Sequence, residues 1–154
     1  MNFDKKFKTN GHKLTADFQY EDTSEDENSL ITQDGTDAEK VRTYEVQKEI
    51  LLRTDYVLPI GEKSQFEFGY RGNFNNLNTA YKLDFNENGT FVVDSDVSNN
   101  LIYKENVNAL YSQYGSKIKD KFSYLLRLRS EATDMTVDQR TSNDYQNRTY
   151  SSFF

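Results

Sequence analysis

Hydrophobic and polar residues alternate along most of the chain. In Lys13–Glu21, every second residue is apolar or aromatic and the residues between them are polar. The same period of two runs through Arg42–Leu58, with Lys48 and Leu51 as exceptions, and through Gln65–Phe74. Successive side chains of a β-strand point to opposite faces of a sheet. The pattern therefore predicts strands with one apolar and one polar face.

The alternation continues toward the C-terminus, with one ambiguous segment. Val107, Ala109 and Tyr111 extend the apolar face, although Leu110 and Tyr114 on the other face blur the pattern. The pattern is clear again in the apolar set Phe122, Tyr124, Leu126 and Leu128. Helical spacing fits these segments less well than a period of two. We predict about seven strands, which are Asn2–Lys8, Lys13–Glu21, Val41–Leu58, Gln65–Asp84, Leu101–Tyr114, Phe122–Thr136 and Tyr145–Phe154.

Two kinds of connection alternate between these strands. The short connections are Thr9–His12, Pro59–Glu62 and Gly115–Asp120, and Asn-Gly, as in the first, is favoured in type I′ hairpin turns. The long polar connections are Asp22–Lys40, Asn86–Asn99 and Asp134–Arg148. Short turns at one end and long loops at the other are typical of outer-membrane barrels, whose short turns face the periplasm. The sequence thus predicts an all-β, antiparallel, up-and-down meander.

Strand length and ring placement favour a membrane barrel over a soluble sandwich. Val41–Leu58 and Gln65–Asp84 each have about twenty residues, against about 5 to 6 in a typical strand. Alternation alone fits either a sandwich with its polar face in water, or a barrel with lipid on the apolar face and a polar lumen. Aromatic rings gather at membrane interfaces, and rings lie near the predicted strand ends at Tyr20, Tyr44, Tyr56, Phe74 and Tyr111.

Composition narrows the function classes. Aromatic residues make up 14% of the 154 residues although the mean hydropathy is −0.90, whereas a disordered chain of this polarity would be poor in rings. The net charge of −6, without a basic stripe, argues against nucleic acid as a partner. The chain has no cysteine and a single histidine, His12, beside a tight turn, so we expect no enzyme activity. The chain contains no apolar run of about 18 residues, so the sequence predicts no transmembrane helix.

From Tyr103 the sequence reads YKENVNALYSQYGSKIKDKFSYLLRLRSEATDMTV. It follows the pattern Y-x-E-N-V-x-A-x-Y, then a short turn, then a strand ending L-R-x-E-x-T. The matching residues are Tyr103, Glu105, Asn106, Val107, Ala109, Tyr111, Phe122, Leu128, Arg129, Glu131 and Thr133. This stretch resembles the barrel of TonB-dependent receptors in the outer-membrane β-barrel family. Leu126-Arg127-Leu128-Arg129 stands where that family more often has Gly-Leu-Arg, a mild departure.

The resemblance implies a fold, a location and partners. Such receptors have a barrel of about 22 strands with a plug domain, lie in the outer membrane of Gram-negative bacteria, and import nutrients with energy from the TonB complex. Residues 1–154 would form one partial barrel domain without the plug and the closing strands. Its partners would be outer-membrane lipid, the rest of the barrel, the plug and the TonB complex. A siderophore, an oligosaccharide or a peptide would be the ligand, and no cofactor is implied.

The polar face carries the candidate functional residues. We expect these residues to line the lumen and to form charge ladders with one another or with a plug, and direct ligand contact is the alternative. They are Asp17, Glu45, Arg53, Asp55, Glu67, Arg71, Arg127, Arg129 and Glu131.

Two polar segments are weighed as cation sites. Asp84–Thr90 has the oxygen spacing of a calcium loop, but Ser95 replaces the acidic residue at the twelfth position. We prefer a polar turn at Asn88-Gly89 and predict no metal site. The acidic run Glu21–Glu27 is interpreted as solvated rather than as a cation-binding loop.

Three other functions stay open. A soluble β-sandwich could bind carbohydrate through Tyr and Phe. A smaller, complete outer-membrane barrel of about eight strands could be structural or adhesive. An outer-membrane enzyme would need clustered acid, His or Ser side chains at the rim, whereas His12 lies at the short-turn end.

Overall fold

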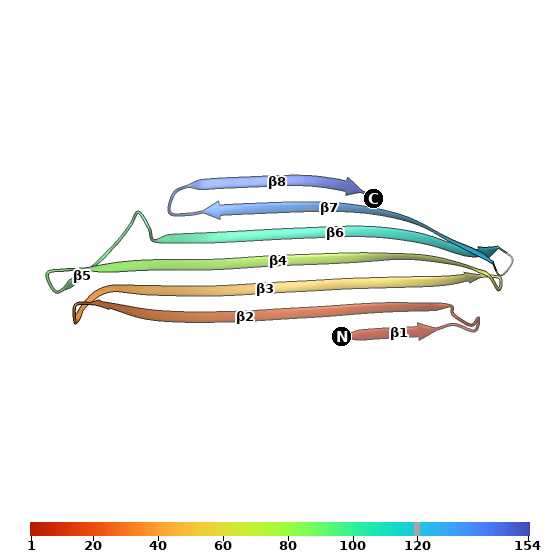
Figure 1. Cartoon of the computed structure of the whole chain (residues 1–154), viewed down its shortest axis with the longest axis horizontal. Coiled ribbons are helices and arrows are strands. Elements are labelled where there is room, and N and C mark those ends of the chain that lie inside the picture. Colours follow the sequence, from red (N-terminus) through yellow and green to blue (C-terminus); the bar gives the residue numbers. More distant parts are fainter. Residues whose placement is uncertain (119–120) are drawn as a thin grey trace.

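The computed structural model describes residues 1–118 and 121–154 as one open antiparallel sheet. Figure 1 shows the strands side by side in a single layer, with β1 and β8 at the two edges. The strand order is β1-β2-β3-β4-β6-β7-β8, and β5 pairs with β4. The bounds are β1 (Asn2–Lys6), β2 (Lys13–Gln33), β3 (Thr36–Ile60), β4 (Ser64–Glu87), β5 (Thr90–Val93), β6 (Asn99–Ile118), β7 (Phe122–Gln139) and β8 (Asp144–Phe153). The predicted all-β meander is confirmed.

The extra strand, β5, lies inside the predicted loop Asn86–Asn99. It pairs with the end of β4, from Asp84 opposite Val93 to Glu87 opposite Thr90. β6 takes over the same edge of β4 once the chain returns. β5 and β6 therefore act as one interrupted strand, and the four-residue β5 is added to the about seven long strands that were predicted. The described residues contain no helix long and apolar enough to cross a membrane.

The predicted loop Asp22–Lys40 is wrong, because β2 and β3 continue through it as a long hairpin. They meet at a two-residue turn, Asp34-Gly35, in which Gln33 pairs with Thr36. Asp34 and Gly35 have φ angles of 51° and 79°, and positive φ at both central residues is the signature of a type I′ turn. Polar side chains occupy both faces here, so no apolar alternation marked this part as strand.

Two other predicted connections are also shorter than expected. β7 and β8 extend into the predicted loop Asp134–Arg148 and leave only residues 140–143 as the connection. β6 continues to Ile118 through most of the predicted turn Gly115–Asp120, whose residues 119–120 lie outside the described residues. Paired backbone thus replaces most of the expected loop, because ladder hydrogen bonds satisfy polar backbone groups whatever the side chains are.

The short turns at the opposite end are largely as predicted. His12 N donates to Thr9 O over 3.0 Å, and Gly11 has a φ of 79° whereas Asn10 has no positive φ. The turn is therefore of type II, which corrects the expectation of type I′. Pro59 still pairs with β4, so the second turn is the loop 61–63.

The strand register gathers the apolar side chains on one face of the sheet, called here the apolar face. Ile50 of β3 pairs with Tyr20 of β2 and with Phe74 of β4, and the same parity holds across the sheet. The opposite face is called the polar face.

On β6 the predicted phase was wrong. Leu110 and Tyr114 lie on the apolar face, opposite Tyr70 and Phe66, whereas Val107, Ala109 and Tyr111 lie on the polar face. Tyr111 therefore does not belong to an apolar-face ring set. β6 also contributes a polar side chain to the apolar face. Asn108 Oδ1 accepts a 2.7 Å hydrogen bond from the Tyr70 hydroxyl.

The apolar face has a limited height. On β3 its apolar residues between Lys48 and the short turn run from Ile50 to Leu58, close to the about 9 to 11 residues with which a strand crosses a membrane, and Val46 and Tyr44 lie beyond Lys48. Above Ile50, Lys48 Nζ lies 3.5 Å from Asp22 Oδ2. We call the residues between these limits the apolar band, and the strands that continue past Lys48 the extension.

The upper limit of the apolar band is oblique. Level with Ile50 in the register, β6 and β7 carry Asn106 and Asp134, and on the apolar face the last large apolar side chain of β7 is Leu128. Barrel strands are tilted by about 35–45° from the barrel axis. A limit that runs parallel to a membrane must therefore cross the register rows at an angle, as this one does.

Candidate functional site on the polar face

The polar face is the more enclosed side of the sheet. The buried side chains Val57, Ala109 and Thr133 all lie on it, whereas Leu110 and Leu126 on the apolar face are 62% and 64% exposed. Among the described residues no second layer packs against the sheet. A soluble sandwich would cover its apolar face with a second sheet. The uncovered apolar face therefore requires an apolar environment from outside the described chain.

Four arginines on three strands surround one hollow on the polar face. Arg53 of β3 lies directly opposite Arg71 of β4, and β7 contributes Arg127 and Arg129. The hollow has a volume of about 340 Å³ and is also lined by Tyr111 and Gln113 of β6. The sequence placed the arginines on this face, and the register brings them together. Tyr111 and Gln113 were missed, because Tyr111 was assigned to the other face.

Two of the arginines hold carboxylates on their own strands. Arg53 Nε donates to Asp55 Oδ2 over 2.8 Å, and Arg129 Nη2 donates to Glu131 Oε2 over 2.6 Å. The Arg53 side chain is 58% exposed and that of Asp55 only 18%, so the guanidinium covers the carboxylate. Asp55 Oδ1 is buried and accepts no hydrogen bond. Both arginines line the hollow as well.

A chain of hydrogen bonds fixes the third arginine. Glu67 accepts hydrogen bonds from Gln65 and, over 2.7 Å, from Gln113 Nε2. Gln113 Oε1 in turn accepts from Arg127 Nε over 2.9 Å. This chain of hydrogen bonds crosses β4, β6 and β7. It orients Arg127 through an amide oxygen and not through a carboxylate. Arg71 makes no hydrogen bond or ion pair within residues 1–118 and 121–154.

The remaining predicted residues lie at two other places on the polar face. Asp17 lies opposite Arg53 on β2, beside the hollow. Glu45 lies in the extension, where it accepts a 3.3 Å hydrogen bond from Thr79 Oγ1. The sheet therefore brings eight of the nine predicted residues to one region and leaves Glu45 apart.

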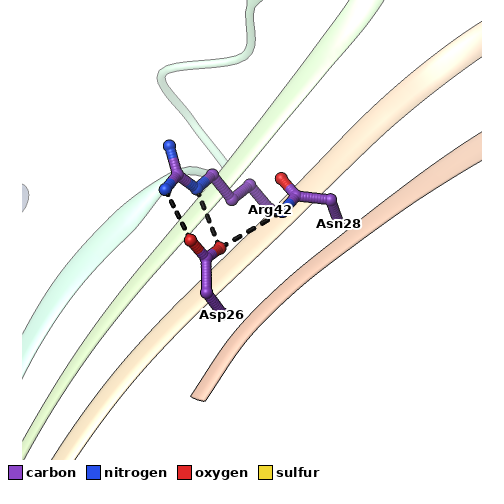
Figure 2. A network of polar contacts seen from close by, with 3 residues as sticks. All are labelled: Asp26, Asn28 and Arg42. Carbon is purple, nitrogen blue, oxygen red and sulfur yellow. Dashed lines mark hydrogen bonds and ion pairs between the residues drawn. The ribbon is translucent and has the colours of Figure 1, made fainter. Parts of the chain in front are cut away.

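A separate polar network lies on the extension, on the same side as the apolar face. Figure 2 shows the Arg42 guanidinium beside the Asp26 carboxylate, to which it donates two hydrogen bonds, of 3.0 Å from Nε and 2.7 Å from Nη2. Asn28 Nδ2 donates to the same carboxylate over 3.2 Å. The hydrogen bonds from Arg42 lower the pKa of Asp26. The acidic run is thus at least partly neutralised by the partner strand.

The candidate calcium loop forms a hairpin turn. Asn88 and Gly89 have φ angles of 53° and 90°, as a type I′ turn requires, and Gly89 N donates to Asn86 Oδ1 over 2.7 Å. The preferred polar turn is confirmed. No group of three His, Cys, Asp or Glu side chains that could hold a metal gathers among the described residues.

The lone histidine belongs to an aromatic cluster at the short-turn end. His12 Nε2 lies 2.8 Å from the Tyr56 hydroxyl, and its ring stacks on Phe7 with centroids 4.0 Å apart. Phe68 extends the cluster, 5.2 Å from Tyr56. Rings with polar tips at one limit of an apolar band are typical of an interfacial girdle.

Comparison with known proteins agrees with this geometry. A sequence model of the outer membrane protein beta-barrel family matches residues 5–154. No curated protein matches the chain. The match includes β2 to β8 and the last two residues of β1. The chain belongs to the outer membrane protein beta-barrel family, and its location is the outer membrane.

Proposed function

We propose that the chain is part of the wall of a TonB-dependent receptor, which imports a nutrient actively and carries out no catalysis. The polar face lines the lumen in this proposal, and the remaining strands and a plug complete the protein. The observation that carries the proposal is the set of charged side chains on the polar face at the level of the apolar band. Arg or Lys on a lipid-facing barrel surface costs about 2–4 kcal/mol at the midplane, so four arginines there require a polar interior.

The open sheet supports a barrel with more strands than those described. β1 and β8 are edges of the sheet rather than partners of each other. The extension of β2, β3 and β4 far beyond the apolar band fits a tall extracellular wall. The motif from Tyr103 to Thr133 adds the specific likeness to receptors of this class.

The second candidate is a smaller structural barrel, which fits the family equally well. Uptake in living cells separates the two. Cells that make the complete protein and cells that lack it are compared for uptake of a ferric siderophore, an oligosaccharide and a peptide, with and without a protonophore. Active import predicts uptake of at least one nutrient that needs the protein and stops when the proton gradient collapses. A structural barrel predicts no difference between the cells, and a passive pore predicts uptake that continues with the protonophore.

A further inference from the structure

We infer that the arginine hollow binds the anionic group of a small ligand, through carboxylate or phosphate oxygens. The inference rests on the proposed function in one respect, because the polar face must meet the aqueous lumen for a ligand to reach it. The site consists of Arg53, Arg71, Arg127 and Arg129, with Gln113 as a positioning residue.

The first argument is the balance of charge inside the hollow. Asp55 and Glu131 each neutralise one arginine of the four. Arg127 is bonded to an amide oxygen, and Arg71 makes no bond within the described residues. The carboxylates of this region do not line the hollow itself. Arg71 and Arg127 therefore line the hollow without a direct ion pair to a carboxylate of the described residues.

The second argument is the direct pairing of like charges. Arg53 and Arg71 are opposite one another on neighbouring strands. Side chains in such pairs have Cβ atoms about 4.5–5.5 Å apart, and like charges there repel. An anion that bridges both guanidinium groups replaces this repulsion with two attractive contacts. The planar fork of arginine matches the oxygens of a carboxylate or phosphate in two places at once.

The third argument is preorganisation and size. Asp55, Glu131 and Gln113 already hold three of the guanidinium groups in place, so little side-chain freedom is lost on binding. The volume of about 340 Å³ lies at the lower end of the range for small-molecule sites, roughly 300–1,000 Å³. The hollow thus suits a small polyanion or one anionic arm of a larger nutrient.

The test measures binding of two probes, citrate and inorganic phosphate, to the complete protein in detergent at low ionic strength by calorimetry. We expect saturable binding of at least one probe, weakened roughly tenfold by Arg71→Gln and by Arg127→Gln, the loss expected for one charge-assisted hydrogen bond. Arg148→Gln on β8 is the matched control, because Arg148 lies on the same face outside the hollow. It should leave the affinity unchanged. Arg71→Lys, which keeps the charge and loses the fork, should give an intermediate loss and serves where the glutamine variant does not fold.

Three results would overturn the inference. They are the absence of binding by either probe, an equal loss with Arg148→Gln, and unchanged affinity in the Arg71 and Arg127 variants. Absence of binding would include the case in which a carboxylate of the protein's own plug fills the hollow. The uptake assay keeps this result apart from the proposed function. Protonophore-sensitive import without anion binding would reject only the anion site, whereas anion binding lost in Arg71→Gln without such import would reject only the receptor.

Discussion

Gly69 of β4 lies directly opposite Tyr111 of β6, and the ring of Tyr111 covers the glycine. A Cβ on Gly69 would lie 2.6 Å from two ring atoms and 2.5 Å from the carbonyl oxygen of Thr54. The ring could turn aside, but the Thr54 oxygen is backbone and cannot move without disturbing the pairing of β3 and β4. The close approach of a strand and a ring therefore requires glycine at this position.

Gly69→Ala should lower the free energy of unfolding by about 1–3 kcal/mol, the usual cost of overpacking. Urea unfolding of the complete protein in detergent measures it. Gly115→Ala is the control, because the nearest atom to its Cβ would be the tip of Leu125 at 3.3 Å, and this tip can move. Equal stability of the two variants would contradict the argument.

Gly35 at the tip of the β2–β3 hairpin tests the extension. Its φ is 79° and a Cβ there would touch nothing within 4 Å, so only backbone conformation opposes a side chain. Gly35→Ala should cost about 1–2 kcal/mol and lower the hydrogen-exchange protection of amides near Gln33 and Thr36. Asp34→Asn should be tolerated, since Asn adopts positive φ readily. Unchanged protection in Gly35→Ala would mean that the turn is not of type I′.

The membrane-level strands could be predicted from the sequence because one face of each must be apolar there. The extension could not, because polar residues such as Asp26 and Arg42 stand there on the face that is apolar nearer the short turns, and no period of two results. Asp34-Gly35 was a hairpin signal in the sequence, but no alternating apolar residues flanked it. Figure 2 shows polar residues in this part of the hairpin, with an ion pair between neighbouring strands.

The sequence predicted which residues lie on the polar face, but it did not predict how they are arranged there. Parity alone puts Arg53 and Arg71 on the polar face, but only the register of β3 against β4 makes them neighbours. Register depends on pairing along the whole strand, and a slip by one residue moves every side chain to the other face. β6 was assigned to the wrong face for a related reason. Its register against β4 puts Ala109 and Tyr111 on the polar face, opposite Arg71 and Gly69.

The Asp26–Arg42 pair predicts a pH effect at the outer end of the sheet. Hydrogen bonds from Arg42 lower the pKa of Asp26 below its ordinary 3.8. A depressed pKa stabilises the folded hairpin above the unfolded value, and this contribution is lost as pH falls through the folded pKa. The loss therefore occurs below about pH 4. A carboxyl-detected NMR titration should show the low midpoint of Asp26.

Arg42→Gln should return the midpoint of Asp26 toward 3.8, and Arg140→Gln, which removes a distant exposed arginine, should leave it unchanged. Overall stability should hardly change, because exposed ion pairs contribute little. An ordinary midpoint in the unmodified protein would mean that the ion pair does not form in solution.

Leu128 and Leu30 give the sharpest test of which surroundings meet the apolar face. Their exposed fractions are similar, at 61% and 51%, but Leu128 lies in the apolar band and Leu30 in the extension. Leu128→Arg should lower the free energy of unfolding by about 2–4 kcal/mol in a lipid bilayer, and Leu30→Arg by about 0–1 kcal/mol, since the cost of a charge on the lipid face falls away from the midplane. Urea unfolding of the complete protein in phospholipid vesicles measures both. Because exposure is nearly matched, a difference reports lipid and not packing, and two equally small effects would place the apolar band in water.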